Sequence, residues 1–177
     1  YQINRAQCER LYARVLSYAQ TIGSLSEMRA LDLFCGVGSI TLTLAPLFKE
    51  VAGIEIVPAA IENARQNAAQ NGIKNVIFFC ADALGAPEIL REKHFSPDLV
   101  VVDPPRKGLS PQICDFLVKN EAKHLIYVSC EPSTLARDIK LLSAGGFMLS
   151  NLSAFDMFPR TANVECVALL SKVEKWL

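Results

Sequence analysis

The sequence is short of the residues that bind metal ions. It has two histidines, His94 and His124, and its six cysteines form no C-x-x-C pair. Zinc and iron–sulfur sites draw on cysteines and histidines at short, regular spacings. We therefore expect no metal site in this chain, and free thiols in a reducing compartment.

Net charge and long apolar runs are also lacking. Eighteen basic residues balance eighteen acidic ones, which argues against a free-standing nucleic-acid-binding module. No apolar run approaches the roughly 20 residues of a membrane span, and the opening "YQINRAQCERLY" is polar and amphipathic, unlike a signal peptide. These features predict a soluble, cytoplasmic protein. The length predicts one domain over residues 1–177, and the missing initial methionine indicates a fragment of a longer protein.

What the sequence does contain is an alternation of short apolar runs with longer stretches of helical spacing. The predicted strands are residues 30–34, 51–57, 75–79, 98–103 and 124–129, then two more at 147–158 and 163–173. The predicted helices are residues 1–23, 39–49, 58–72, 83–93, 110–120 and 132–146. This order predicts an α/β Rossmann-like fold. Its mostly parallel seven-stranded sheet would carry helices on both faces and an antiparallel terminal strand.

A glycine turn follows the first predicted strand, in "LDLFCGVGSITL". Gly36 and Gly38 let the backbone approach a ligand closely at the carboxyl end of a strand. The dinucleotide fingerprint G-x-G-x-x-G requires glycine at position 41, where this chain has Thr41. The turn therefore predicts a nucleoside site without a pyrophosphate cradle.

Two acids end the next two strands. Glu55 lies where an acid can accept both hydroxyls of a ribose, and Asp82 lies where one can take the amino edge of an adenine. Together with the glycine turn they describe an adenosine without phosphates, which makes S-adenosylmethionine the candidate cofactor. The alternative is that both acids only cap the helices that follow them.

The fourth strand ends in "VVVDPPRKGL", a turn stiffened by two prolines. It delivers Asp103 and Arg106 to the same end of the sheet. Amino-group methyltransferases have a similar turn with an aromatic residue in the place of Arg106, so methylation of an amino group is disfavoured. The alternative is a rigid turn with a solvated basic pair.

The fifth strand ends in "YVSCEP", which places Cys130 before a predicted helix. The positive end of a helix dipole lowers the pKa of a thiol, so this position suits a nucleophile. Glu131, the next residue, is expected to raise the pKa of the thiol and oppose the helix. The alternative is a buried, inert cysteine, to which we assign the five others: Cys8, Cys35, Cys80, Cys114 and Cys166.

Five motifs in order resemble the RNA 5-methyluridine methyltransferase family, in the style of bacterial enzymes acting on 23S ribosomal RNA. They are "LDLFCGVGSITL", "VAGIEIVPAAIENARQNAAQNGIKNVIF", "VVVDPPRKGL", "YVSCEPSTLARD" and "FDMFPRTANVECVALL". The resemblance implies a class I S-adenosylmethionine-dependent catalytic domain. Enzymes that methylate C5 of cytosine resemble this scheme but carry a cysteine where this chain has Arg106, so uracil is favoured.

The resemblance also assigns roles to residues. It implies that Cys130 attacks C6 of the uracil and that Glu165 is the base that removes the C5 proton. Glu165 is also unusual by itself, as an acid in the apolar run "VECVALL", although an edge strand could carry it. The implied cofactor contacts come from Gln2, Phe34, Gly36, Gly38, Ser39, Glu55, Asp82 and Asp103, and Arg106 is assigned to the substrate.

The expected partner is RNA, with ribosomal RNA preferred and transfer RNA as the alternative. The resemblance implies an N-terminal RNA-binding domain outside this chain, on which efficient methylation would depend. Two other hypotheses stay open: a different S-adenosylmethionine-dependent methyltransferase in which Cys130 is structural, and a non-catalytic module that binds cofactor or RNA.

Overall fold

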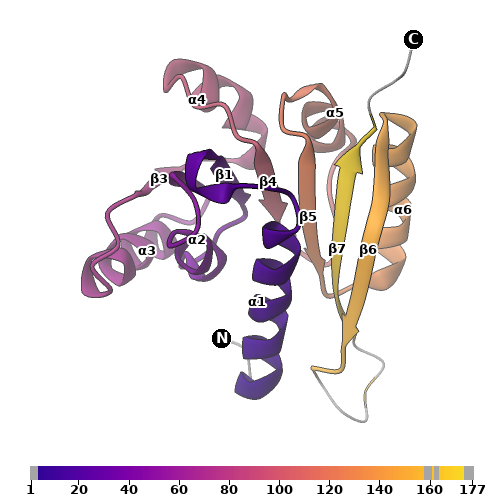
Figure 1. The fold of residues 1–177 in the computed structure, drawn as a ribbon, viewed down its shortest axis with the longest axis horizontal. Helices are drawn as coiled ribbons and strands as arrows, with labels where there is room; N and C mark the ends of the chain where they lie inside the picture. Colours follow the sequence, from indigo (N-terminus) through magenta and orange to yellow (C-terminus); the bar gives the residue numbers. More distant parts are fainter. Residues whose placement is uncertain (1–3, 158–160, 162–163, 174–177) are drawn as a thin grey trace.

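The computed structural model describes residues 4–157, 161 and 164–173. They form one seven-stranded sheet between two layers of helices (Figure 1). In chain order the elements are α1 (Arg5–Gln20), η1 (Leu25–Glu27), β1 (Arg29–Leu33), α2 (Ser39–Leu44), β2 (Glu50–Glu55), α3 (Pro58–Gln70), β3 (Val76–Cys80), η2 (Ala83–Gly85), α4 (Ala86–Glu92), β4 (Leu99–Val102), α5 (Pro111–Lys119), β5 (His124–Ser129), α6 (Pro132–Ala144), β6 (Phe147–Phe155) and β7 (Glu165–Lys172).

The strand order across the sheet is β3-β2-β1-β4-β5-β7-β6. The first five strands pair in parallel, whereas β7 pairs antiparallel with both β5 and β6. The predicted fold class is confirmed, including the antiparallel strand of the terminal hairpin. That strand lies inside the sheet, because β7 inserts between β5 and β6 and leaves β6 at the edge.

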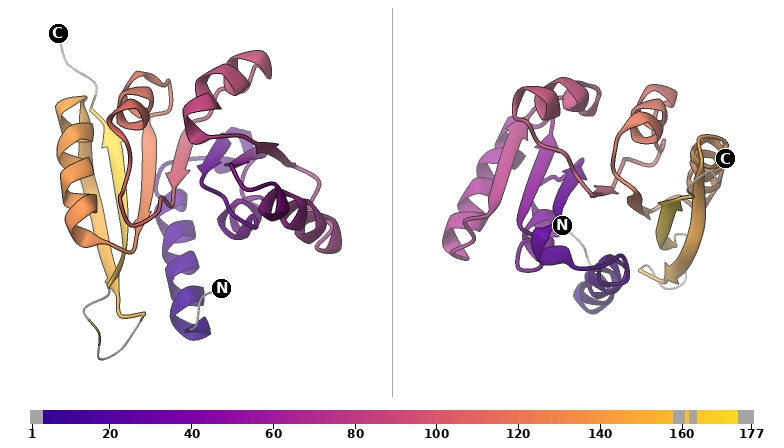
Figure 2. Two further views of the ribbon diagram at one scale, coloured as in Figure 1. Left: turned by 180° about the vertical axis from the view of Figure 1, so that it is seen from behind. Right: turned by 45° about the horizontal axis from the view of Figure 1, so that its top comes forward.

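Each face of the sheet packs on its own set of helices (Figure 2). In β5, Leu125 and Tyr127 pack with α4, α5 and α6, whereas Ile126 and Val128 pack with α1 and α2. This alternation follows from the period of two in a strand. Both faces are therefore buried, which explains the uninterrupted apolar runs of the central strands.

The arrangement of the strands brings the predicted site residues that the structure describes to one end of the sheet. The carboxyl ends of β1 to β5 lie there, followed by the turns that lead into the helices. Because β7 runs in the opposite direction, its first residue, Glu165, lies at the same end. Ser129 at the end of β5 pairs with Cys166, so Cys130 and Glu165 are brought close together across two neighbouring strands.

Two helix predictions were wrong at their ends. The predicted helix 39–49 ends at Leu44: Ala45 still has helical dihedrals, but Pro46 has no N–H to continue the helical hydrogen bonds. The predicted helix 83–93 divides into η2 and α4, and Pro87 stands in the first turn of α4, where the missing N–H costs nothing. Over the described ranges, no helix has the length and apolar character that crossing a membrane requires.

Candidate active site

A cavity of about 810 Å³ opens at the carboxyl ends of β1 and β4. Four predicted site residues line it: Phe34, Gly36, Ser39 and Asp103. The rest of the wall comes from β1, the glycine turn and helix α1, through Arg5, Cys8, Glu9, Tyr12, Asp32, Cys35, Val37 and Ile40. Its volume is in the range of small-molecule sites. No sequence pattern indicated that α1 would form part of the cavity wall.

The glycine turn has the left-handed backbone that its glycines favour. Gly36 has φ 54° and Gly38 has φ 83°, and a Cβ on Gly36 would meet no atom within 4 Å. A Cβ on Gly38 would lie 3.1 Å from the Phe78 ring and 3.2 Å from Ala64. Gly36 thus leaves open space beside the cavity, whereas Gly38 lets α2 and α3 pack closely. Phe34 is also left-handed, with φ 65°, a rare conformation for a residue with a side chain.

Glu55 braces this turn from the end of β2. Its carboxylate accepts hydrogen bonds from the Gly36 N–H at 3.2 Å and from the Val57 N–H at 3.0 Å. Asp82, which is exposed, caps η2 by accepting a hydrogen bond from the Leu84 N–H at 2.8 Å. The capping role that was the alternative for these acids is therefore present in Asp82, whereas helix α3 after Glu55 has no side-chain cap. A carboxylate has about four acceptor positions, so both acids retain capacity for a ligand.

Asp32, in β1, is a site residue that the sequence analysis missed. It is completely buried, and its Oδ2 accepts a hydrogen bond from the Thr41 hydroxyl at 2.6 Å. Its Oδ1 has no partner in the described part of the chain. Burial raises the pKa of Asp32 to about 7. The signal in the sequence was an acid inside the apolar run "ALDLF".

Asp103 connects the cavity with a second group of ionisable residues. Its side chain is exposed on the cavity side, yet the protein surrounds the carboxylate closely. This desolvation, with the negative charges of Asp32 and Glu165, raises the pKa of Asp103 to about 7. Asp103 thus lies within electrostatic reach of both the cavity and the start of β7.

The second group consists of Cys130, Glu165 and Arg106. Glu165 is only 7% exposed, and burial raises the pKa of its carboxyl while the charge of Arg106 opposes the rise. Cys130 is half-buried, and burial, then Glu165 and Asp103, raise the pKa of its thiol, while a backbone hydrogen bond and Arg106 lower it. The fold thus places a thiol, a buried acid and one guanidinium together.

The prediction of a lowered pKa for the Cys130 thiol was wrong, because burial, Glu165 and Asp103 outweigh the backbone hydrogen bond and Arg106. Other donors at the start of α6 are engaged by side chains. The Ser129 hydroxyl oxygen accepts the Glu131 N–H at 3.1 Å, and the Glu131 carboxylate accepts the Ser133 N–H and hydroxyl. Glu131 is thus the N-cap of α6. The carboxylates that raise the pKa of the thiol are Glu165 and Asp103 instead.

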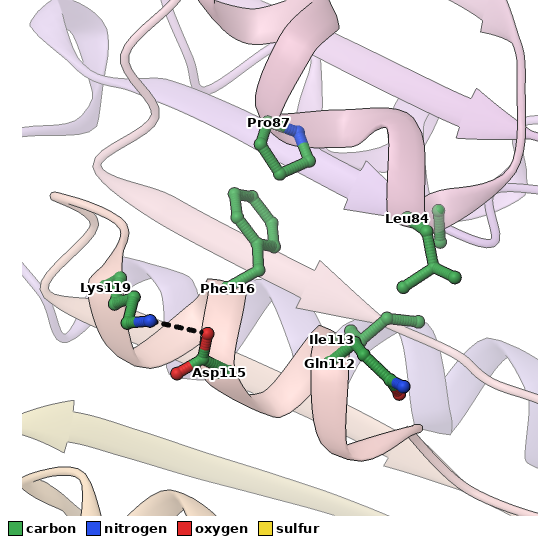
Figure 3. A pocket seen from close by; sticks show the side chains of 8 residues that line it. Leu84, Pro87, Gln112, Ile113, Asp115, Phe116 and Lys119 are labelled. Atoms are coloured by element: carbon green, nitrogen blue, oxygen red, sulfur yellow. Dashed lines mark hydrogen bonds and ion pairs between the residues drawn. The ribbon is translucent and has the colours of Figure 1, made fainter.

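A smaller hollow of about 300 Å³ lies between η2, α4 and α5 (Figure 3). Its lining is mainly apolar, from Leu84, Pro87, Ile113 and Phe116, and the Lys119–Asp115 ion pair stands at its rim. No predicted site residue lines it. Gln2 lies outside the described residues, and within the described ranges no three His, Cys, Asp or Glu side chains gather as metal ligands would.

Comparisons with known proteins identify the family of this chain. The family model for tRNA (uracil-5-)-methyltransferase matches residues 4–173. An uncharacterized RNA methyltransferase of Bacillus cereus is 43% identical over 179 residues, and one of Staphylococcus aureus is 44% identical over 171 residues. These matches cover 99% and 97% of this chain and 37% of each relative, so the chain spans little more than a third of their length.

Solved structures of methyltransferases are similar to this chain. The tRNA (uracil-54, C5)-methyltransferase of Pyrococcus abyssi, in complex with S-adenosyl-L-homocysteine, has a TM-score of 0.79 and 33% identity, over 96% of this chain and 39% of that one. The N-methyltransferase NodS of Bradyrhizobium japonicum has a TM-score of 0.74 at 20% identity, over 97% of this chain and 99% of NodS, a likeness of fold. The chain therefore belongs to the tRNA (uracil-5-)-methyltransferase family.

Proposed function

We propose that this chain transfers a methyl group from S-adenosylmethionine to C5 of a uridine in RNA. The observation that carries the proposal is the grouping of Cys130, Glu165 and Arg106 beside a cavity that Asp103 borders. A methyltransferase that acts on an amino group has no need of a thiol and a buried acid at this place. The C5 carbon of uracil needs both, because it is a poor nucleophile until a thiolate adds to C6.

The cavity fits the proposed cofactor. S-adenosylmethionine supplies a methyl group on a positively charged sulfur, next to an ammonium group. Asp32 presents a buried oxygen at the cavity that has no partner among the described residues, and Asp103 also lines the cavity. Glu55 stands at the end of β2, where it can accept ribose hydroxyls, and Gly36 leaves space beside the turn. The S-adenosyl-L-homocysteine in the Pyrococcus structure supports this assignment.

Cys130 begins the proposed reaction. Its thiolate attacks C6 of the uracil and forms the S–C6 bond, and the electron pair of the C5–C6 double bond moves toward the C4 carbonyl. C5 then attacks the methyl group: the C5–methyl bond forms, the bond between the sulfonium sulfur and the methyl group breaks, and S-adenosylhomocysteine leaves with that electron pair. Arg106 lies close enough to favour the thiolate electrostatically.

Glu165 completes the reaction as the base. Its carboxylate takes the proton from C5, the C5–C6 double bond forms again, and the S–C6 bond breaks to release the thiolate. Burial raises the pKa of Glu165, which makes its carboxylate a stronger base. Its position next to Cys130 follows from the register of β5 and β7.

We propose two candidate classes of RNA substrate. The sequence motifs favour ribosomal RNA, whereas the name of the family and the Pyrococcus structure favour transfer RNA. The target base must leave its stack to reach Cys130, so a loop or an opened helix is the expected substrate. We also propose that residues 1–177 form the catalytic domain of a cytoplasmic protein whose RNA-binding domain lies in the remaining part of the full-length chain.

The full-length protein with labelled S-adenosylmethionine tests this function. Transcripts of transfer RNA and of 23S ribosomal RNA are incubated with it, and the labelled nucleoside is identified after digestion. The proposal predicts label in 5-methyluridine from one of the two RNAs. Label in a methylated amino group, or no transfer to either RNA from a protein that binds the cofactor, would refute it.

A further inference from the structure

The loop after β4 is tied to helix α6 by hydrogen bonds that bridge about 30 residues of sequence. The Thr134 hydroxyl donates to the Arg106 carbonyl at 3.1 Å and to the Glu131 carbonyl, at the start of its own helix, at 3.0 Å. Arg137 Nη2 donates to the carbonyls of Lys107 and Leu109, at 2.9 Å and 3.3 Å. The Leu109 N–H donates to Asp138 Oδ2 at 2.7 Å. The loop segment 106–109 is therefore held at both ends by side chains of one helix.

Asp138 is the buried centre of these contacts. It is completely buried, and besides the Leu109 N–H it accepts hydrogen bonds from the Tyr127 hydroxyl at 2.7 Å and from Arg137 Nε at 2.8 Å. Gly108 passes so close that a Cβ there would lie 2.5 Å from Asp138 Oδ2. A buried carboxylate that accepts several donors holds its partners in one geometry, so the loop has little freedom to move relative to α6.

The same helix begins immediately after Cys130, with Glu131 as its N-cap. The loop carries Arg106, whose positive charge acts on the thiol of Cys130 and on Glu165. Helix α6 therefore connects the nucleophile with the cation that favours its ionised form. A loop that drifted from α6 would take this charge away from the thiol.

We propose that Thr134, Arg137 and Asp138 form a clamp that positions the Arg106 loop against Cys130, and that they are positioning residues for the methyl transfer. This inference rests on the proposed function, because it assigns Cys130 the role of nucleophile. Thr134, Arg137 and Asp138 are not among the described residues that line the cavity. The clamp sets the reactivity of the thiol and leaves the cofactor cavity unchanged.

Two variants of the full-length protein loosen the clamp without removing its buried carboxylate. Thr134→Val deletes the hydroxyl of a half-buried residue at nearly constant volume, and Thr134→Ser, which keeps the donor, is its matched control. Arg137→Lys keeps a positive charge beside Asp138, but its single nitrogen cannot serve Asp138 and both loop carbonyls together. Lys140→Ala, at an exposed position further along α6, controls for unspecific effects on the helix.

The first measurement is the pH dependence of iodoacetamide alkylation at Cys130, followed by mass spectrometry of its peptide. The midpoint is expected to rise by about half a unit to one unit in Thr134→Val and Arg137→Lys, because the charge of Arg106 is less well placed. Thr134→Ser and Lys140→Ala are expected to keep the wild-type midpoint. The exposed Cys80 is an internal reference whose profile stays constant in every variant.

The second measurement is kinetic. The clamp predicts that kcat for RNA methylation falls about tenfold in Arg137→Lys, while the Kd for S-adenosylmethionine stays within about twofold of the wild-type value. Unchanged alkylation profiles in folded variants, or a loss of cofactor affinity equal to the loss of kcat, would overturn the proposal. If Arg137→Lys does not fold, the pair Thr134→Val and Thr134→Ser decides.

The alkylation measurement requires neither RNA nor cofactor, so the clamp and the proposed function can be refuted independently of each other. A shifted Cys130 profile without any RNA methylation would contradict the proposed function and leave the clamp intact. Normal methylation with unshifted profiles would contradict the clamp and leave the function intact.

Discussion

The proposed site has two halves, one at the ends of β1 to β3 and one at the ends of β4 and β5 with the start of β7. The two halves differ in how their acidic side chains are held. At β1 to β3, Glu55 accepts hydrogen bonds from the N–H groups of Gly36 and Val57, and Asp82 accepts one from the Leu84 N–H, so both acids shape the backbone around them. At β4, β5 and β7, Asp103 and Glu165 lie close to a thiol, and burial raises the pKa of both carboxyls. We propose that the first half holds the cofactor and that the second carries out the proton transfer and the covalent chemistry.

The largest effect should come from the second half. Cys130→Ala should lower RNA methylation by about 1,000-fold or more, because the covalent route through C6 is lost. Binding of S-adenosylmethionine, measured by calorimetry, should stay within about twofold of wild type. Cys80→Ala is the control, since this exposed cysteine is free and lies outside the proposed chemistry. Retained turnover in Cys130→Ala would show that Cys130 is not the nucleophile.

Removal of the base should separate formation of the adduct from its breakdown. Glu165→Gln should lower turnover by about 100-fold, while Cys130 still adds to C6 and C5 of the uracil still accepts the methyl group. The methylated RNA should then accumulate as a covalent complex that survives denaturing electrophoresis. A slow variant that traps no RNA would indicate that Glu165 acts before the thiol adds.

A change in the first half should affect the cofactor alone. Glu55→Gln should weaken binding of S-adenosylmethionine by about tenfold, because a charged acceptor for hydroxyl groups is lost. The alkylation rate of Cys130 should not change, since Glu55 is not among the groups that shift the pKa of this thiol. An equal effect on both readouts would show that the two halves are not independent.

The last effect concerns stability and its pH dependence, and leaves the chemistry of the second half aside. Folding raises the pKa of Asp32 from 3.8 to about 7, so the folded state binds this proton more tightly than the unfolded state. Its contribution is present in full below pH 3.8 and is lost as pH rises to about 7. Asn cannot ionise, so Asp32→Asn should gain about 2 to 4 kcal/mol relative to wild type between acidic pH and pH 8. Urea unfolding at pH 5 and pH 8 measures this, and an equal difference at both pH values would contradict it.

Much of the fold could be predicted because each strand and helix carries its own pattern. The run "HLIYVS" is the strand β5 over the predicted residues, and the terminal hairpin followed from two apolar runs without a helix between them. The site was harder, because its electrostatics depend on contacts distant in sequence. The chain near Cys130 showed a helix start and Glu131, but the groups that set the pKa of the thiol come from β4 and β7.

The clamp residues are a second case in which contacts distant in sequence could not be predicted. Asp138 occupies an inward position of α6 between Leu135 and Leu142, and a buried acid in an apolar stripe was the available signal. Its partners, Leu109 and Tyr127, come from other elements, which no local pattern could reveal. Tyr12 and Asp32, on the cavity wall, were missed for the same reason.

The central claim is that Cys130 is the nucleophile, and an RNA that carries 5-fluorouridine at the methylated position tests it most directly. Fluorine at C5 cannot leave as a proton would, so the methylated base should stay bound to the enzyme. The account predicts a stable complex in which mass spectrometry locates the nucleotide on the Cys130 peptide, with S-adenosyl-L-homocysteine released in equal amount. An enzyme that methylates normal RNA but forms no adduct at Cys130 would contradict it.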